Sequence, residues 1–234
     1  MEAHTAFHII ARIHSDFKEK FGIPRQSGLV EELESVVVFE PAYRNEDALR
    51  GLKEFSHIWL LWQFSESVRQ SWSPTVRPPR LGGNERRGVF ATRSPFRPNP
   101  IGLSAVRLLG IEKHEKYGNV LRVAGADLLD GTPIYDIKPY LPYADSHPEA
   151  KGSFSEASKE YRLQVECPDA LRNRIPQEKR QALLGVLAQD PRPAYQKDPE
   201  RHYGMNFAGY EVKFRVEGDR LLVEEIREEC RKEV

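Results

Sequence analysis

Short stretches in which hydrophobic and polar residues alternate recur through the N-terminal part of the chain, a pattern typical of β-strands with one buried face. These stretches are Phe7–Ile13, Leu33–Phe39, Ile101–Ile111, Val120–Ala124 and Ile134–Tyr140. About six short strands with one short helix predict a mainly β domain of barrel type. We expect this domain to end near Tyr143.

The stretch Phe55–Phe64 is nearly all apolar and aromatic. It is too short to span a membrane and predicts a strand buried on both faces. We interpret His57, inside this stretch, as a hydrogen-bonded core residue rather than a catalyst. Upstream, Asn45 is a candidate N-cap for a short helix that runs through Leu52.

The pattern changes after a polar segment, which predicts three parts: a barrel over residues 1–145, a linker over 146–160 and a small α+β domain over 161–234. In the last part we expect a strand at Tyr161–Val165, a helix at Gln177–Ala188 and strands at Phe207–Val216 and Leu221–Ile226. A domain of this size is marginal by itself, so we expect it to pack against the barrel.

The composition excludes several classes of protein. The 35 basic residues equal the 35 acidic ones, so no global field attracts nucleic acid. The two cysteines lie far apart, and no leader or long apolar run occurs, which predicts a soluble, cytoplasmic protein without disulfides. The seven histidines lack metal-ligand spacing, and no Walker, dinucleotide-binding or serine-hydrolase motif is present. We therefore expect no metal.

A proline-stiffened, arginine-rich loop is the most unusual feature of the chain. Gly88–Ser104 reads Gly-Val-Phe-Ala-Thr-Arg-Ser-Pro-Phe-Arg-Pro-Asn-Pro-Ile-Gly-Leu-Ser and begins and ends like a strand. Between Thr75 and Arg97 stand six arginines, no lysine and one acid, Glu85. Guanidinium groups suit phosphate and carboxylate, so the segment predicts an anion site, although a rigid surface turn with solvated arginines is the alternative.

An acidic turn, Asp127–Asp130, follows the strand at Val120–Ala124. Carboxylates at strand ends accept hydrogen bonds from ribose hydroxyl groups in nucleotide sites. The alternative is a plain turn at Asp130-Gly131.

Five segments together resemble the TsaA family, in particular its bacterial full-length branch, TrmO. These segments are Gly88–Ser104, Asp127–Pro133 with Asp136–Tyr140, Pro24–Gln26, Thr75–Asn84 and Ala188–Tyr195. The resemblance implies a methyltransferase that uses S-adenosylmethionine to methylate N-threonylcarbamoyladenosine beside the tRNA anticodon. It also implies an N-terminal β-barrel and a homodimer with the cofactor near the subunit interface.

The resemblance also implies site residues. The expected cofactor contacts are Pro24, Arg25, Gln26, Phe64, Ser65, Arg93, Leu103, Asp127, Leu128, Leu129 and Asp130. The family often has His where this chain has Ser65, so a backbone contact survives there while a side-chain role does not. The expected tRNA contacts are Arg77, Arg80, Arg87, Arg97, Arg192 and Tyr195.

Methyl transfer to this acceptor also requires that the nitrogen lose its proton, which a nearby carboxylate or neutral histidine can accept. Asp136 and Asp190 are the candidates, and the sequence leaves the choice between them open. Two other functions use the same arginine loop: an RNA-binding module without chemistry, and a methyltransferase for a small molecule. A methyltransferase for a small molecule would give the C-terminal domain no function.

Overall fold

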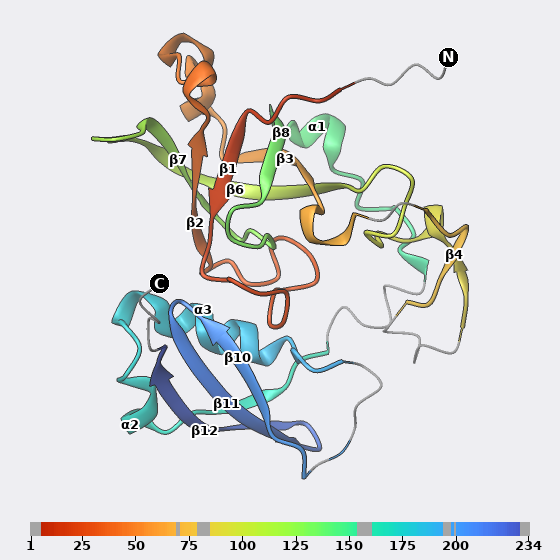
Figure 1. The fold of residues 1–234 in the computed structure, drawn as a ribbon, viewed down its shortest axis with the longest axis vertical. Coiled ribbons are helices and arrows are strands. Elements are labelled where there is room, and N and C mark those ends of the chain that lie inside the picture. The colour runs from red at the N-terminus through yellow and green to blue at the C-terminus, as the bar shows by residue number, and fades with distance from the viewer. Residues whose placement is uncertain are drawn as a thin grey trace.

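The computed structural model describes residues 6–68, 71–78, 85–153, 161–193, 198 and 200–229. The chain forms a barrel stacked on a smaller sheet with helices, as Figure 1 shows with the barrel above. The mainly β prediction with a small α+β C-terminal part is confirmed. No helix in the described part of the chain is long and apolar enough to cross a membrane.

Six strands close into the barrel in the order β1-β2-β7-β6-β3-β8. Their bounds are β1 Ala11–His14, β2 Glu34–Phe39, β3 His57–Gln63, β6 Ile101–His114, β7 Gly118–Ala124 and β8 Pro133–Pro139. Every neighbouring pair is antiparallel. Alternate residues of these strands, such as Ile13, Val37 and Leu121, fill the interior and leave no measurable exposure.

Strand β3 departs from the prediction of a strand buried on both faces. Ile58, Leu60 and Trp62 point into the barrel core, whereas the residues between them are only half-buried. His57 is exposed, so its interpretation as a core residue was wrong. The apolar outward residues of β3 produced the continuous hydrophobic run that suggested burial on both faces.

Short helices and a two-stranded ribbon connect the barrel strands or, in the case of α1, follow the last of them. They are the 3-10 helices Pro41–Tyr43, Glu46–Leu49, Leu52–Glu54, Ser65–Ser67 and Val89–Ala91, the helix α1 Pro142–Asp145, and strands β4 Thr75–Val76 and β5 Arg87–Gly88. Asn45 is the N-cap as predicted, since its Oδ1 accepts from the amide of Asp47 at 2.9 Å. The predicted helix is, however, two short 3-10 turns, because Gly51 adopts a left-handed φ of 82° between them.

The C-terminal part is a four-stranded sheet in the order β10-β11-β12-β9, covered by helix α3. Its elements are β9 Gln164–Glu166, α2 Asp169–Arg172, α3 Gln177–Ala188, β10 Tyr203–Phe207, β11 Tyr210–Glu217 and β12 Arg220–Glu228. The helix Gln177–Ala188 matches the prediction. The expected single strand Phe207–Val216 is instead two strands, because Ala208 and Gly209 both take positive φ and close a tight hairpin.

The loop between β1 and β2 links the two parts. Phe17, Val30 and Leu33 belong to the hydrophobic core of the C-terminal sheet and helix, not to the barrel core. A Cβ on Gly185 of α3 would lie 2.7 Å from a methyl carbon of Val30, so the helix and this loop touch closely. The expected packing of the two parts is present, while the domain bounds at 145 and 161 stay a prediction.

An ion pair reinforces this junction. Lys179 on α3 donates to a carboxylate oxygen of Asp16 at 2.7 Å, and the Asp16 side chain is only 12% exposed. Burial raises the pKa of Asp16, and the hydrogen bond and charge of Lys179 offset part of that effect. Consequently the loop that carries Pro24–Gln26 rests on the C-terminal part.

Candidate functional site

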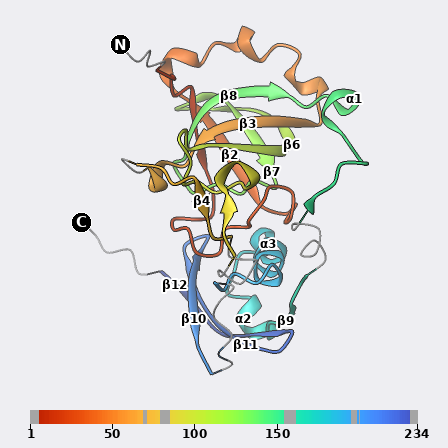
Figure 2. The same cartoon turned by 90° about the vertical axis from the view of Figure 1, so that its right-hand side faces the viewer.

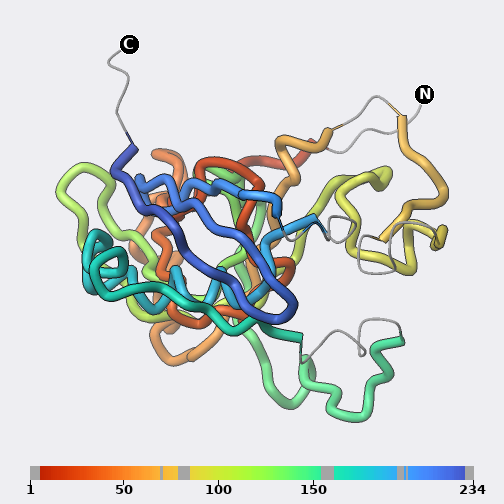
Figure 3. Tube along the Cα trace, turned by 90° about the horizontal axis from the view of Figure 1, so that it is seen from below, coloured from red at the N-terminus to blue at the C-terminus, as the bar shows by residue number. Residues whose placement is uncertain are grey.

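The main cavity has a volume of about 1880 Å³ and lies where the barrel, the arginine loop and the end of α3 meet. In Figure 2, β4 stands in front of this junction, and Figure 3 shows residues 64–68, 71–78 and 85–100 projecting to one side of both sheets. The described lining residues fall in seven segments, within residues 20–26, 62–67, 73–78, 86–103, 127–132, 151–153 and 186–193. The site therefore uses residues from both parts of the chain.

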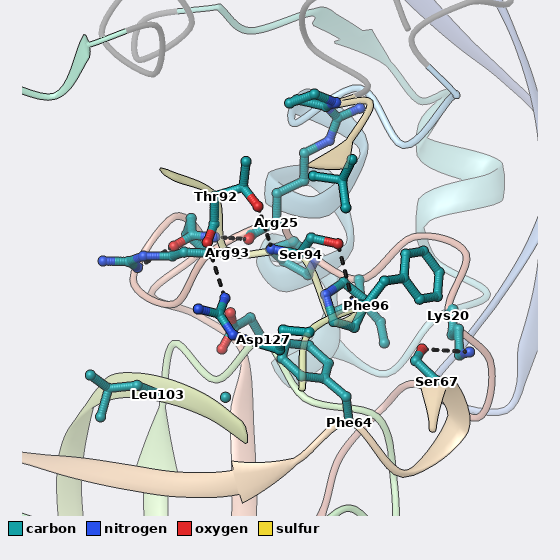
Figure 4. A pocket seen from close by; sticks show the side chains of 18 of the residues that line it. Lys20, Arg25, Phe64, Ser67, Thr92, Arg93, Ser94, Phe96, Leu103 and Asp127 are labelled. Carbon is teal, nitrogen blue, oxygen red and sulfur yellow. Dashed lines mark hydrogen bonds between the residues drawn. The ribbon is translucent and has the colours of Figure 1, made fainter. Parts of the chain in front are cut away.

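The cavity collects most of the predicted residues. Those that line it are Pro24, Arg25, Gln26, Phe64, Ser65, Arg77, Arg87, Arg93, Arg97, Leu103, Asp127, Leu129, Asp190 and Arg192. Arg80 and Tyr195 lie outside the described residues. Figure 4 shows Arg93 and Asp127 on one side of the cavity, with Phe64 and Leu103 along its floor.

A hydrogen-bonded chain runs from the barrel core to the cavity wall. The indole Nε1 of Trp62 donates to Ser104 Oγ at 3.0 Å, and Ser104 Oγ donates to Asp127 Oδ1 at 2.6 Å. Trp62 lies on β3, Ser104 lies on the neighbouring β6, and Asp127 follows β7. Ser104, itself oriented by Trp62, thus holds the Asp127 carboxylate against the barrel end.

The hydrogen bonds from Trp62 through Ser104 to Asp127 depend on Gly102. The Trp62 ring lies over Gly102, and a Cβ at that position would approach ring atom Cε2 to 2.3 Å. Only glycine leaves room for an indole there. Trp62 in turn packs on Phe64 with ring centroids 4.3 Å apart.

The environment of Asp127 makes its carboxylate an unusual one. Burial raises the pKa of Asp127, while the Ser104 hydroxyl, nearby backbone amides and the positive charge of Arg93 lower it in part. Burying a carboxylate costs free energy unless donors compensate it. A carboxylate kept at this position despite that cost is a candidate functional group.

Arg93 joins the two loops above Asp127. Its guanidinium donates to the side-chain oxygen of Gln26, which ties the arginine loop to Pro24–Gln26. The two predicted motifs lie far apart in sequence, and this hydrogen bond connects them directly in the fold.

The arginine loop is stiffened by its own polar groups as well as by proline. The Ser94 amide donates to Thr92 Oγ1 at 3.3 Å, the Phe96 amide donates to Ser94 Oγ at 3.2 Å, and Arg97 Nη1 donates to the Thr92 carbonyl at 3.0 Å. The strand expected at the start of the loop is instead the 3-10 helix Val89–Ala91. The guanidinium of Arg97 is therefore oriented by the backbone of its own loop.

Two residues of the acidic turn point elsewhere. Leu128 is fully buried in the barrel core. Asp130 Oδ1 accepts from the Ser15 amide at 3.1 Å and contacts His14 Nδ1 at 3.2 Å, and Asp130 does not line the cavity. At this turn, the cavity-lining residues are Asp127 and Leu129.

The two candidate proton acceptors are not equivalent. Asp136 pairs with Lys138 at 2.7 Å and does not line the cavity. Asp190 lines the cavity, but both its oxygens accept from Arg192, at 2.8 and 2.9 Å, and Tyr161 OH adds a third bond at 3.1 Å. Asp190 thus orients Arg192, whose carbonyl accepts from Arg25 at 3.4 Å.

Ser104 and Trp62 are the site residues that the sequence analysis missed as such. Both lie inside predicted strands, Ser104 in an alternating one and Trp62 in one predicted to be buried on both faces, and the pattern therefore indicates core for both. A serine at an inward position of an otherwise apolar pattern was the available signal, because a buried hydroxyl needs a partner.

No group of three or more histidine, cysteine, aspartate or glutamate side chains is placed to hold a metal ion among the described residues. The cavity exceeds the volume of roughly 300–1,000 Å³ that is usual for one small-molecule ligand. Arginines and a buried carboxylate on its walls are groups that suit a charged ligand.

Comparison with known proteins identifies the family. The tRNA-methyltransferase O N-terminal domain matches residues 12–146, and the TrmO C-terminal domain matches residues 160–229. The chain belongs to the TrmO family, which confirms the resemblance found in the sequence.

Individual relatives agree along the length of the chain. A protein of Escherichia coli named tRNA (adenine(37)-N6)-methyltransferase is 45% identical over 218 residues, 90% of this chain and 92% of the relative. A Pseudomonas aeruginosa protein named a putative S-adenosylmethionine-dependent methyltransferase is 43% identical over 211 residues, 87% of this chain and 89% of the relative. The crystal structure of TrmO from Pseudomonas aeruginosa superposes with a TM-score of 0.79 at 34% identity, covering 97% of this chain and 99% of that one.

Proposed function

We propose that this chain transfers a methyl group from S-adenosylmethionine to the exocyclic nitrogen of N-threonylcarbamoyladenosine beside the tRNA anticodon. Membership of the TrmO family and the names of the relatives support the reaction class. The observation that carries the proposal is the joint lining of one large cavity by the acidic turn, the Pro24–Gln26 loop and the arginine loop.

The described residues fit the cofactor. Phe64 and Leu103 offer apolar surface for the adenosine, and Asp127 offers negative charge to a cationic ligand. Arg93 and Arg25 are cations beside it that suit the carboxylate of an amino acid. When bound, the cofactor supplies a methyl group already activated on a sulfonium, so the protein mainly has to position the acceptor nitrogen.

The protein's own polar groups would then position the acceptor nitrogen of the tRNA. The threonyl carboxylate of the substrate matches a guanidinium fork, and Arg97 is a cavity arginine whose guanidinium is oriented by the Thr92 carbonyl. Arg77, Arg87 and Arg192 would meet tRNA phosphates, together with Arg80 and Tyr195. Of the acidic candidates, Asp190 lines the cavity and is proposed to keep Arg192 in place rather than to accept the proton.

A homodimer is part of the proposal. Leu103 and Leu109 are 51% and 38% exposed on the outer face of β6, and the half-buried Trp59 and Leu61 continue that face on β3. A stable interface typically buries more than about 1,200 Å² in total. Because Leu103 also lines the cavity, a dimer of this kind would bring the cofactor near the interface. We also propose a cytoplasmic location, where the tRNA substrate is found.

Binding of S-adenosylmethionine to the purified chain, followed by mass spectrometry of tRNA nucleosides, tests the reaction. The expected product is the N-methylated form of threonylcarbamoyladenosine. RNA binding without any affinity for the cofactor would instead favour a binding module without chemistry. Sedimentation of the wild type and of Leu109→Arg tests the dimer, since the charged variant should be a monomer.

A further inference from the structure

A second, smaller cavity opens beside the main one. Its volume is about 200 Å³, and its walls are Ser67, Val68, Ser71, Trp72, Pro95, Phe96, Arg97, Pro98 and Pro100. Pro95, Phe96 and Arg97 also line the main cavity, so the two spaces share one wall. The small cavity lies below the size range of pockets for whole cofactors or drug-sized ligands, and it suits a single flat group.

Each cavity has one exposed aromatic ring in its wall, and the two rings contact each other. Trp72 lines the small cavity and Phe90 lines the large one. Their rings stack with centroids 6.1 Å apart and an angle of 30° between planes, yet they are 50% and 74% exposed. Large aromatic side chains left in solvent at the rim of a site are typical of surfaces that bind a partner.

The charge around these rings selects the kind of partner. Arg97 lines both cavities, and Arg77 and Arg86 line the large one. The acidic Glu85 of this segment is paired with Arg87 at 2.6 Å. Exposed aromatic rings among arginines suit single-stranded nucleic acid, whose bases stack on rings while its phosphates pair with cations.

We propose that the small cavity and the Trp72–Phe90 pair bind an unpaired nucleobase that flanks the methylated adenosine in the anticodon loop. This inference rests on the proposed function, because it assigns the neighbour of the same substrate nucleotide. The shared wall at Pro95–Arg97 would separate the two bases, with the target in the large cavity and its neighbour in the small one. Stacking of this kind holds the loop in place without selecting a particular base.

The test is binding of an anticodon stem-loop RNA, with and without the base on either side of the target adenosine. Loss of a stacked base typically weakens binding by about tenfold, so Trp72→Ala should weaken binding of the intact RNA by about that factor. Trp72→Phe should retain most of the affinity. An RNA that is abasic at the flanking position should bind the wild type weakly and should be unaffected by Trp72→Ala. Phe90→Leu provides a second variant with the same expectation.

Tyr143→Ala is the matched control, because Tyr143 is 87% exposed and lines neither cavity. Equal weakening of the intact and abasic RNAs, or no weakening of either, would overturn the proposal. The proposal would also be overturned if Trp72→Ala changed the protein from dimer to monomer but retained its RNA affinity. The Trp72–Phe90 pair would then contact a second copy of the protein and not RNA. These RNA-binding readouts require no methyl transfer, so failure of the reaction itself is seen separately.

Discussion

Ser104 donates a 2.6 Å hydrogen bond to Asp127 and receives one from the Trp62 indole, so a core tryptophan and a cavity carboxylate are connected through one hydroxyl. This relationship explains how a buried charge is maintained at the barrel end. It also predicts that residues outside direct ligand contact control the cofactor site.

Replacing Ser104 by Ala should weaken S-adenosylmethionine binding. The variant leaves a buried carboxylate oxygen without its donor, which typically costs about 1–3 kcal/mol, or roughly 5- to 150-fold if the cost falls on the bound state. Calorimetric titration measures the change. Ser146→Ala, at an exposed serine outside both cavities, serves as the control. Unchanged affinity for Ser104→Ala would refute the positioning role.

Replacing Gly102 by Ala should destabilise the fold and disturb the hydrogen bonds from Trp62 through Ser104 to Asp127. The new Cβ would overlap the Trp62 ring, and overpacking in a core typically costs about 1–3 kcal/mol. Urea denaturation measures the free energy of unfolding. Gly110→Ala is a matched control on the same strand, because nothing lies within 4 Å of a Cβ there. Equal effects at the two glycines would contradict the close packing of Trp62.

Asp127→Asn should change how stability depends on pH. Because burial raises the pKa of Asp127 in the folded state, the wild type loses stability as pH rises through that folded-state pKa. Asparagine carries no charge, so the variant escapes this loss. Its stability relative to wild type should therefore rise with pH above the ordinary aspartate value and level off at higher pH, while cofactor binding falls. Denaturation across a pH series checks the sign, and a pH-independent difference would count against it.

Arg77→Ala should weaken tRNA binding and flatten its dependence on salt. A lost phosphate contact lowers the slope of log affinity against log salt by about 0.7–0.9. Arg50→Ala is the control, since Arg50 is an exposed arginine that pairs with Asp47 and does not line the cavity. Filter binding at several salt concentrations gives both slopes. Parallel slopes for Arg77→Ala and wild type would exclude a phosphate contact at Arg77.

The sequence predicted most of the fold because its alternating patterns are strong. The helix Gln177–Ala188 and the strands around Leu33–Phe39 and Val120–Ala124 were found with small errors in their bounds. The predicted secondary structure was wrong where local backbone hydrogen bonds, and not the hydrophobic pattern, determine the conformation. Val89–Ala91 reads as a strand but forms a 3-10 helix, because its Thr92 end is turned back by hydrogen bonds to the Val89 carbonyl.

The site was predicted by motif rather than by geometry. Sequence placed Asp127 and Asp130 in one acidic turn, but only tertiary structure shows that Asp127 meets Ser104 while Asp130 meets Ser15 and His14. Likewise, no local pattern indicates that Phe17 and Val30 enter the core of the C-terminal part. Such long-range pairings depend on chain topology, which single-segment patterns do not encode.

The central claim is that the arginine loop recognises a threonylcarbamoyl carboxylate on adenosine. Its most direct test is methyl transfer from S-adenosylmethionine to one tRNA prepared with and without threonylcarbamoyladenosine, with the products quantified by nucleoside mass spectrometry. The modified tRNA should be methylated, whereas the unmodified tRNA should react little, because it leaves the guanidinium donors unpaired. Arg97→Ala should reduce turnover on the modified tRNA. Comparable methylation of both tRNAs by the wild type would contradict the claim.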